Sequence, residues 1–135
     1  MTILIIDGQG GNLGRQLVKM LSERLPAAEI HAVGTNSIAT ENMLKAGAHL
    51  AATGENAVVV ACRRADVIAG PVGIVIADAL LGEVTPKMAT AVGQSSATKV
   101  LIPLNRCDTL IAGVQKENTA SLLEDAVAKI CALGK

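Results

Sequence analysis

The fold of this chain is decided by one stretch near the N-terminus, Ile3-Leu4-Ile5-Ile6-Asp7-Gly8-Gln9-Gly10-Gly11-Asn12-Leu13-Gly14-Arg15. Its apolar first part predicts a buried strand, its glycine-dense middle a tight turn, and its last residues the start of a helix. Such a turn brings bare backbone N–H groups close to a phosphate, and the start of the helix adds a partial positive charge. The stretch therefore predicts an anion-binding loop in an α/β protein.

The glycines of this stretch have a spacing found in dinucleotide-binding loops. Gly8-x-Gly10 begins the fingerprint G-x-G-x-x-G, but the third position holds Leu13. The alternative spacing Gly8-x-x-Gly11-x-x-Gly14 fits completely and resembles the loop of extended short-chain dehydrogenases and related Rossmann proteins. A tight turn without a ligand also fits, but the position between a strand and an amphipathic helix favours nucleotide binding. We expect ligand contacts from Gly8, Gln9, Gly10, Gly11, Asn12, Leu13, Gly14 and Arg15.

The rest of the chain predicts strands that alternate with helices. Apolar runs predict further strands at residues 29–33, 48–52, 66–69 and 99–104. Helical spacing predicts helices at residues 13–25, 38–46, 74–81 and 86–92 and from about 119 onward. Val58-Val59-Val60 favours a strand by β-branching, but the alternation demands a crossover, so residues 57–65 are predicted as a helix.

One connection breaks this alternation. Residues 105–108 are too few for a crossover helix, so residues 109–114 are predicted as a sixth strand, antiparallel to the fifth. The expected fold is a single Rossmann-like domain over residues 1–135. It has a doubly wound, mainly parallel sheet of about six strands with helices on both faces.

The end of the second predicted strand lacks the carboxylate that NAD-binding domains place there for the ribose hydroxyls. Thr35, Asn36 and Ser37 follow that strand instead, and they can donate to a 2′-phosphate, with Arg15 adding a positive charge. This slightly favours NADP(H) over NAD(H) as cofactor, although a mononucleotide or another small phosphate-bearing ligand also fits. Thr35 and Asn36 are equally typical of a turn, and Ser37 of a helix cap.

Other loops are expected at the same edge of the sheet, because parallel strands end there together. The loop after the fourth strand would face the glycine loop, and the loop after the third strand would lie nearer the adenosine. Asn105, after the fifth strand, would lie on the other side. The further candidate binding residues in these loops are Thr53, Gly54, Asn56, Gly70, Pro71 and Gly73.

The residues do not define a reaction. The chain has no Tyr, which excludes the Tyr–Lys mechanism of short-chain dehydrogenases. A role as an NAD(P)-dependent reductase completed by a second subunit stays open, with catalytic residues unknown. Asp7, Asp78, Glu83 and Lys87 are candidate acid–base groups, and Asp7, which leads them, fits a role in bracing the loop at least as well.

Two other functions stay open. The first is a non-catalytic nucleotide or metabolite sensor, or a partner-binding module, that uses the same pocket. The second is a thiol enzyme using Cys107, although an inert cysteine is far more common. His31 and His49 show no metal-ligand spacing, so we predict no metal.

The composition limits the partners. Lys plus Arg and Asp plus Glu both number 12, which argues against nucleic-acid binding because that needs a basic surface. The longest charge-free apolar run is interrupted by Gly70, Pro71 and Gly73 and is too short to span a bilayer. Three widely spaced cysteines indicate a reducing cytoplasm. A half-hydrophobic composition at zero net charge favours a homo-oligomer.

Several stretches together resemble one family. They are residues 6–11 (IDGQGG), 32–40 (AVGTNSIAT), 52–57 (ATGENA), 70–78 (GPVGIVIAD), 81–89 (LGEVTPKMA) and 102–107 (IPLNRC). Over nearly its whole length the chain resembles a family of short bacterial proteins that is named as a domain of unknown function, number 3842. The resemblance implies a stand-alone, Rossmann-like bacterial protein and supplies no activity.

Overall fold

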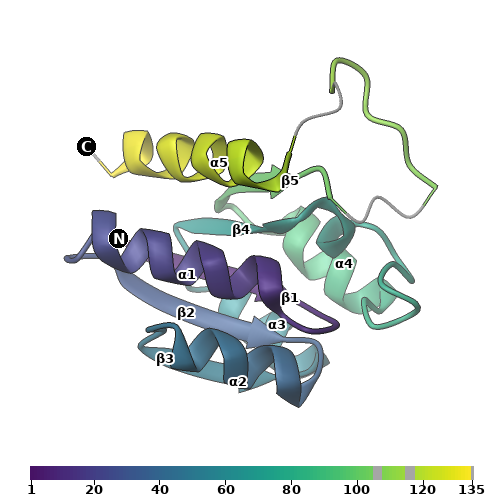
Figure 1. Ribbon diagram of the computed structural model, residues 1–135. Coiled ribbons are helices and arrows are strands. Elements are labelled where there is room, and N and C mark those ends of the chain that lie inside the picture. The colour runs from purple at the N-terminus through teal and green to yellow at the C-terminus, as the bar shows by residue number, and fades with distance from the viewer. Residues whose placement is uncertain (105–107, 115–117, 135) are drawn as a thin grey trace.

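The computed structural model describes residues 1–104, 108–114 and 118–134, and within them five parallel strands form one sheet (Figure 1). The strands are β1 (Thr2–Asp7), β2 (Glu29–Gly34), β3 (Leu50–Thr53), β4 (Val67–Pro71) and β5 (Thr98–Ile102). The helices are α1 (Asn12–Arg24), α2 (Ser37–Lys45), α3 (Glu55–Cys62), α4 (Pro86–Gln94), α5 (Thr119–Leu133) and the short 3₁₀ helix η1 (Val72–Val75).

The strand order is β3-β2-β1-β4-β5, so the chain reverses its direction of winding at β1. Helices α1, α2 and α5 cover one face of the sheet and α3 and α4 cover the other (Figure 1). Strand β1 is buried on both faces, because Ile3 and Ile5 pack into one core and Leu4 and Ile6 into the other. In such sheets the ligand crevice lies at the carboxyl ends of the strands beside this reversal, where β1 and β4 end.

The sixth, antiparallel strand predicted at residues 109–114 is wrong, since the described sheet holds only parallel strands. Gly113 has a φ of 84°, which an extended strand does not allow. Val114 donates instead to the carbonyl of Ile111 in a turn, and Leu110 is 93% exposed. The β-branched and apolar residues of this segment have the composition of a strand, but they have no buried surface to pack against.

The helix predicted at residues 74–81 is also wrong. The chain makes only η1 there and then a compact loop, residues 76–84, which we call the 76–84 loop. Asp78, Leu80 and Leu81 all have left-handed φ values, between 56° and 66°, which interrupt a right-handed helix. Its apolar residues Ala79, Leu80 and Val84 are buried in the core beside α3 and α4. Their spacing therefore marked a buried loop and not a helix.

Candidate functional site

The glycine loop, residues 8–11, joins β1 to α1 through two left-handed residues. Gln9 has a φ of 50° and Gly11 a φ of 71°, and the amide of Gly11 donates to the carbonyl of Gly8 at 2.9 Å. A Cβ on Gly11 would lie 2.7 Å from the Cα of Ala39 in α2. Gly11 is therefore required both by its backbone conformation and by the close approach of α2.

Asp7, the last residue of β1, holds both ends of the turn. Its Oδ1 accepts a hydrogen bond from the amide of Gly8 at 2.8 Å, and its Oδ2 accepts one from the amide of Gly14 at 2.7 Å. The side chain is buried, and burial raises the pKa of Asp7 above its ordinary value, against the lowering effect of these two bonds. With both oxygens engaged, the geometry favours the bracing role for Asp7 over acid–base chemistry.

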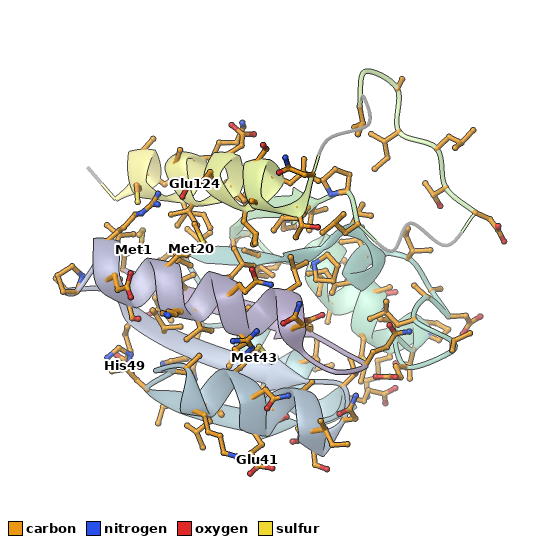
Figure 2. The ribbon with its side chains drawn as sticks, viewed as in Figure 1. Met1, Met20, Glu41, Met43, His49 and Glu124 are labelled. Carbon is orange, nitrogen blue, oxygen red and sulfur yellow. The ribbon has the colours of Figure 1, made fainter. Side chains whose placement is uncertain are left out.

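Gly14 lets α1 pack closely against its neighbours. A Cβ there would lie 2.6 Å from the Sδ of Met43 and 2.9 Å from the Cβ of Asp7. Met43 extends from α2 toward α1 and is fully buried (Figure 2). Two of the three motif glycines, Gly11 and Gly14, therefore serve the packing of α1 and α2, which holds the loop in its position.

The start of α1 leaves backbone donors open. The amides of Gly10, Asn12 and Leu13 have no acceptor within the part of the chain that the structure describes, as is usual for the first turn of a helix. Among the described residues, no atom beyond the two chain neighbours lies within 4 Å of the place that a Cβ on Gly10 would occupy. The first turn carries no acidic residue, and Arg15 donates to the Oδ1 of Asn12 at 2.6 Å. The first turn of α1 therefore offers open N–H groups to an anion and carries no acidic side chain of its own.

A carboxylate from the 76–84 loop lies between the glycine loop and the end of β2. The Oε1 of Glu83 accepts from the amide of Gln9 at 2.8 Å, from the Oγ1 of Thr35 at 2.6 Å and from the Nδ2 of Asn36 at 2.8 Å. Asn36 also donates to the carbonyl of Gln9 at 2.8 Å, which links the same two loops directly. The sequence offered Glu83 only as an acid–base candidate, because no spacing rule joins residues 74 positions apart.

These bonds determine the charge of Glu83. Partial burial alone raises the pKa of a carboxyl group, but the donors from Thr35, Gln9 and Asn36 outweigh it. The net effect is a pKa of Glu83 below its ordinary value. The group is therefore a carboxylate at neutral pH, and three donors converge on one of its oxygens.

The residues after β2 and β3 have structural partners. Asn36, and not Ser37 as predicted, caps α2, because its Oδ1 accepts from the amide of Ala39 at 2.9 Å. Ser37 is the first residue of the helix and is exposed. Thr53 at the end of β3 shares a hydrogen bond with Thr40 of α2 at 2.6 Å between their hydroxyl oxygens. Beyond it, Gly54 precedes α3 with a φ of 103°, and Asn56 lies exposed in the first turn.

The residues predicted to bind after β4, which are Gly70, Pro71 and Gly73, are all buried. A Cβ on Gly70 would lie 2.2 Å from the carbonyl oxygen of Ile6, so this glycine allows β4 to approach β1. The Cδ1 of Leu80 would lie 2.9 Å from a Cβ on Gly8. The 76–84 loop therefore covers Gly8 on the side of β4, and a ligand contact by these three residues stays a prediction.

Lys87, another acid–base candidate, lines a groove apart from the glycine loop. A groove of about 610 Å³ between α3 and α4 is lined in part by Lys87 and Cys62, and it contains no residue of the glycine loop. Cys62 is buried, and burial raises its pKa to about 11, so its thiol is unreactive at neutral pH. Asn105 and Cys107 fall outside the described residues.

Nothing in the described ranges assigns a metal. There, no group of three or more His, Cys, Asp or Glu residues is placed to hold an ion. His31 lies 2.9 Å from the Oε1 of Glu29, and His49 accepts from the amide of Ile30 at 3.0 Å. Among the helices of residues 1–104, 108–114 and 118–134, none is long and apolar enough to cross a membrane.

The chain belongs to the family described as a domain of unknown function (DUF3842), whose model matches residues 2–134. No curated protein matches it. One similar solved structure is a dodecameric FMN-dependent UbiX-like decarboxylase from Escherichia coli O157:H7, at 16% sequence identity and a TM-score of 0.47. The match covers 97% of this chain and 92% of the other.

Proposed function

We propose that this member of the DUF3842 family binds a nucleotide or dinucleotide through the glycine loop and the start of α1. The observation that carries the proposal is the set of open amides at Gly10, Asn12 and Leu13, next to a loop whose other backbone polar groups already have partners. Open backbone donors at the positive end of a helix suit a phosphate group. The position beside β1, where the sheet changes its winding direction, supports the same ligand class.

The ligand would extend from α1 toward β2. A phosphate would lie at the amides of Gly10, Asn12 and Leu13, with Arg15 as the nearest cation of the loop. The sugar would lie over the contact between Gln9 and Asn36, where the two loops meet. The NADP(H) preference predicted from the sequence requires Thr35 and Asn36 to donate to a 2′-phosphate, but both donate to Glu83. Thr35 and Asn36 therefore give no support to that preference while Glu83 is in place.

A non-catalytic sensor or partner-binding module is the second candidate function. The observation that favours it is the engagement of the two carboxylates next to the loop, Asp7 and Glu83, as hydrogen-bond acceptors. A general base must reach the proton that it abstracts, and these groups are held by the protein itself. This function predicts nucleotide binding without turnover, so steady consumption of a bound cofactor with any small substrate would contradict it.

Gly10→Val is the variant that tests the proposed binding. Its side chain would enter the open space in front of the loop. A Cβ on Gly10 meets no other described residue within 4 Å beyond its chain neighbours, and Gly10 has no left-handed φ, so the fold should tolerate the change. Gly93→Val in α4 is the matched control, because a Cβ on Gly93 also meets none of the described residues outside its own helix within 4 Å, and Gly93 has no left-handed φ. Gly11 is a poorer choice, because any side chain there would collide with Ala39.

Calorimetric titration with ADP, ATP, NADH and NADPH gives the readout. We expect the wild-type protein and the Gly93→Val variant to bind at least one of these ligands. We expect Gly10→Val to lose that binding while its melting temperature stays near that of the wild type. Binding by none of the ligands to the wild-type protein, or equal binding by the folded Gly10→Val variant, would refute the proposal.

We also propose that the chain forms a homo-oligomer. Ile38 is 64% exposed and Leu50 is 57% exposed, and they lie on α2 and on the edge strand β3. Apolar side chains exposed near a free sheet edge favour association. Sedimentation equilibrium at micromolar concentration tests this, with a mass above the monomer's 13.8 kDa as the expected result.

A further inference from the structure

We propose that Glu83 makes the site selective for nucleotides with a free ribose 2′-hydroxyl and excludes nucleotides that carry a 2′-phosphate. The inference rests on the proposed function and names the ligand class of that same site. It assigns to the loop between β4 and α4 a role that nucleotide-binding domains usually give to a residue after β2. It reverses the preference predicted from Thr35, Asn36 and Ser37.

The position of Glu83 carries the inference. Its Oε1 lies within hydrogen-bond distance of Gln9 in the glycine loop and of Thr35 and Asn36 directly after β2. A ribose attached to a phosphate at the start of α1 would lie over the contact of these same two loops, beside Glu83. The sequence directly after β2 contains no carboxylate. Glu83, which lies 48 positions after Thr35, supplies one at the same place.

The three donors fix the orientation of the carboxylate and leave part of it available. All three donate to Oε1, and no hydrogen bond to Oε2 exists among the described residues. A carboxylate oxygen can accept more than one hydrogen bond, and a ribose hydroxyl is a suitable donor. The 2′-hydroxyl can therefore bind without displacing Glu83 from its partners.

A 2′-phosphate on the ribose would be repelled by Glu83. Glu83 is ionised at neutral pH, because its donors hold its pKa below the ordinary value. Two negative groups at hydrogen-bond distance repel each other, and a half-buried position screens them less than bulk water does. The donors that a 2′-phosphate would need, the hydroxyl of Thr35 and the amide of Asn36, already donate to Glu83.

Glu83→Gln is the direct test, because glutamine keeps an acceptor oxygen for the three donors and removes the charge. Glu41→Gln is the matched control, since Glu41 lies on the outer side of α2 away from the glycine loop (Figure 2) and pairs with Lys45. Glu83→Ala is a second variant that also removes the acceptor. Circular dichroism and melting temperature report whether each variant is folded.

Two ligand pairs that differ only by a 2′-phosphate give the readout. They are NADH with NADPH, and adenosine 5′-phosphate with adenosine 2′,5′-bisphosphate, titrated by calorimetry at pH 7.5. We expect wild type and Glu41→Gln to bind the ligand without the 2′-phosphate at least about tenfold more tightly, and Glu83→Gln to lose most of that ratio. Glu83→Ala should bind the 2′-phosphorylated ligand better than the wild type does.

The outcomes separate this inference from the proposed function. Tighter binding of the 2′-phosphorylated ligand by the wild type would overturn it, as would an unchanged ratio in both folded Glu83 variants. In either case nucleotide binding itself would stand. Binding of none of the four ligands to the wild type or to the variants would remove the proposed function and this inference together.

Discussion

Asp7→Asn should destabilise the protein by about 2 kcal/mol, through the loss of one of the two bonds that brace the glycine loop. The carboxylate accepts from the amides of Gly8 and Gly14, and it is 4% exposed. Asparagine has the same shape but only one acceptor oxygen, so its NH₂ group must face one of the two amides. The orphaned amide is buried with its partner removed, and such a donor costs about 1–3 kcal/mol.

Asp66→Asn is the matched control for this substitution. The Oδ2 of Asp66 also accepts from a backbone amide, that of Thr2 at 2.7 Å, but this bond is exposed to solvent. Asparagine keeps one acceptor oxygen for this single amide and water can also reach it, so we expect a cost below about 1 kcal/mol. The comparison separates the cost of orphaning a second, buried amide from the general cost of an Asp→Asn change.

Urea unfolding followed by far-UV circular dichroism is the assay, because the chain has no Trp or Tyr to report by fluorescence. With a slope of about 2 kcal/mol per molar urea, the midpoint should fall by roughly 1 M in Asp7→Asn and by less than half of that in Asp66→Asn. Equal, small shifts in both variants would refute the bracing role of Asp7.

Three further predictions concern other contacts. Gly70→Ala should destabilise by about 3 kcal/mol or prevent folding, because the new methyl would meet the backbone oxygen of Ile6 at 2.2 Å; wild-type stability in urea would contradict this. Glu83 has a lowered pKa, so its contribution to stability exists above its unfolded value of 4.5 and disappears as the pH falls through the folded pKa. The difference in melting temperature between wild type and Glu83→Gln should therefore shrink as the pH falls from 7 to 3. A difference that stays constant over this range would contradict the prediction. Cys62, with a pKa of about 11, should stay unmodified by iodoacetamide at pH 7.5 in peptide mass spectra until urea unfolds the protein, and rapid native labelling would contradict its burial.

Most of the architecture follows from local patterns in the sequence. The apolar run of β1, the glycine turn and the stripe of α1 predict the first unit, and the same alternation predicts the parallel α/β sheet that the structure shows. The pattern failed at residues 74–81 and 109–114. In the first segment left-handed residues such as Leu80 interrupt a run with helical spacing, and in the second Gly113 interrupts a run with strand composition. Apolar spacing alone does not report these backbone conformations.

Only the glycine loop of the candidate site could be predicted from the sequence. The loop between Gly8 and Gly14 is contiguous, so its turn and its packing against α2 leave a signature in the glycine spacing. The contact of Glu83 with Gln9 and Thr35 depends on how the 76–84 loop folds over the sheet, and no periodicity encodes it. The sequence consequently suggested a site without an acid, whereas the folded chain places a carboxylate between its two loops.

The most direct test of the account is the affinity of the wild-type protein for NADH, NADPH, adenosine 5′-phosphate and adenosine 2′,5′-bisphosphate, measured by calorimetry beside Gly10→Val and Glu83→Gln. We expect the wild type to bind the ligand without the 2′-phosphate more tightly in at least one pair. We expect Gly10→Val to bind neither member and Glu83→Gln to lose most of the difference between the two. Absence of binding to the wild-type protein, or binding that Gly10→Val leaves intact, would contradict the assignment of the glycine loop as the nucleotide site.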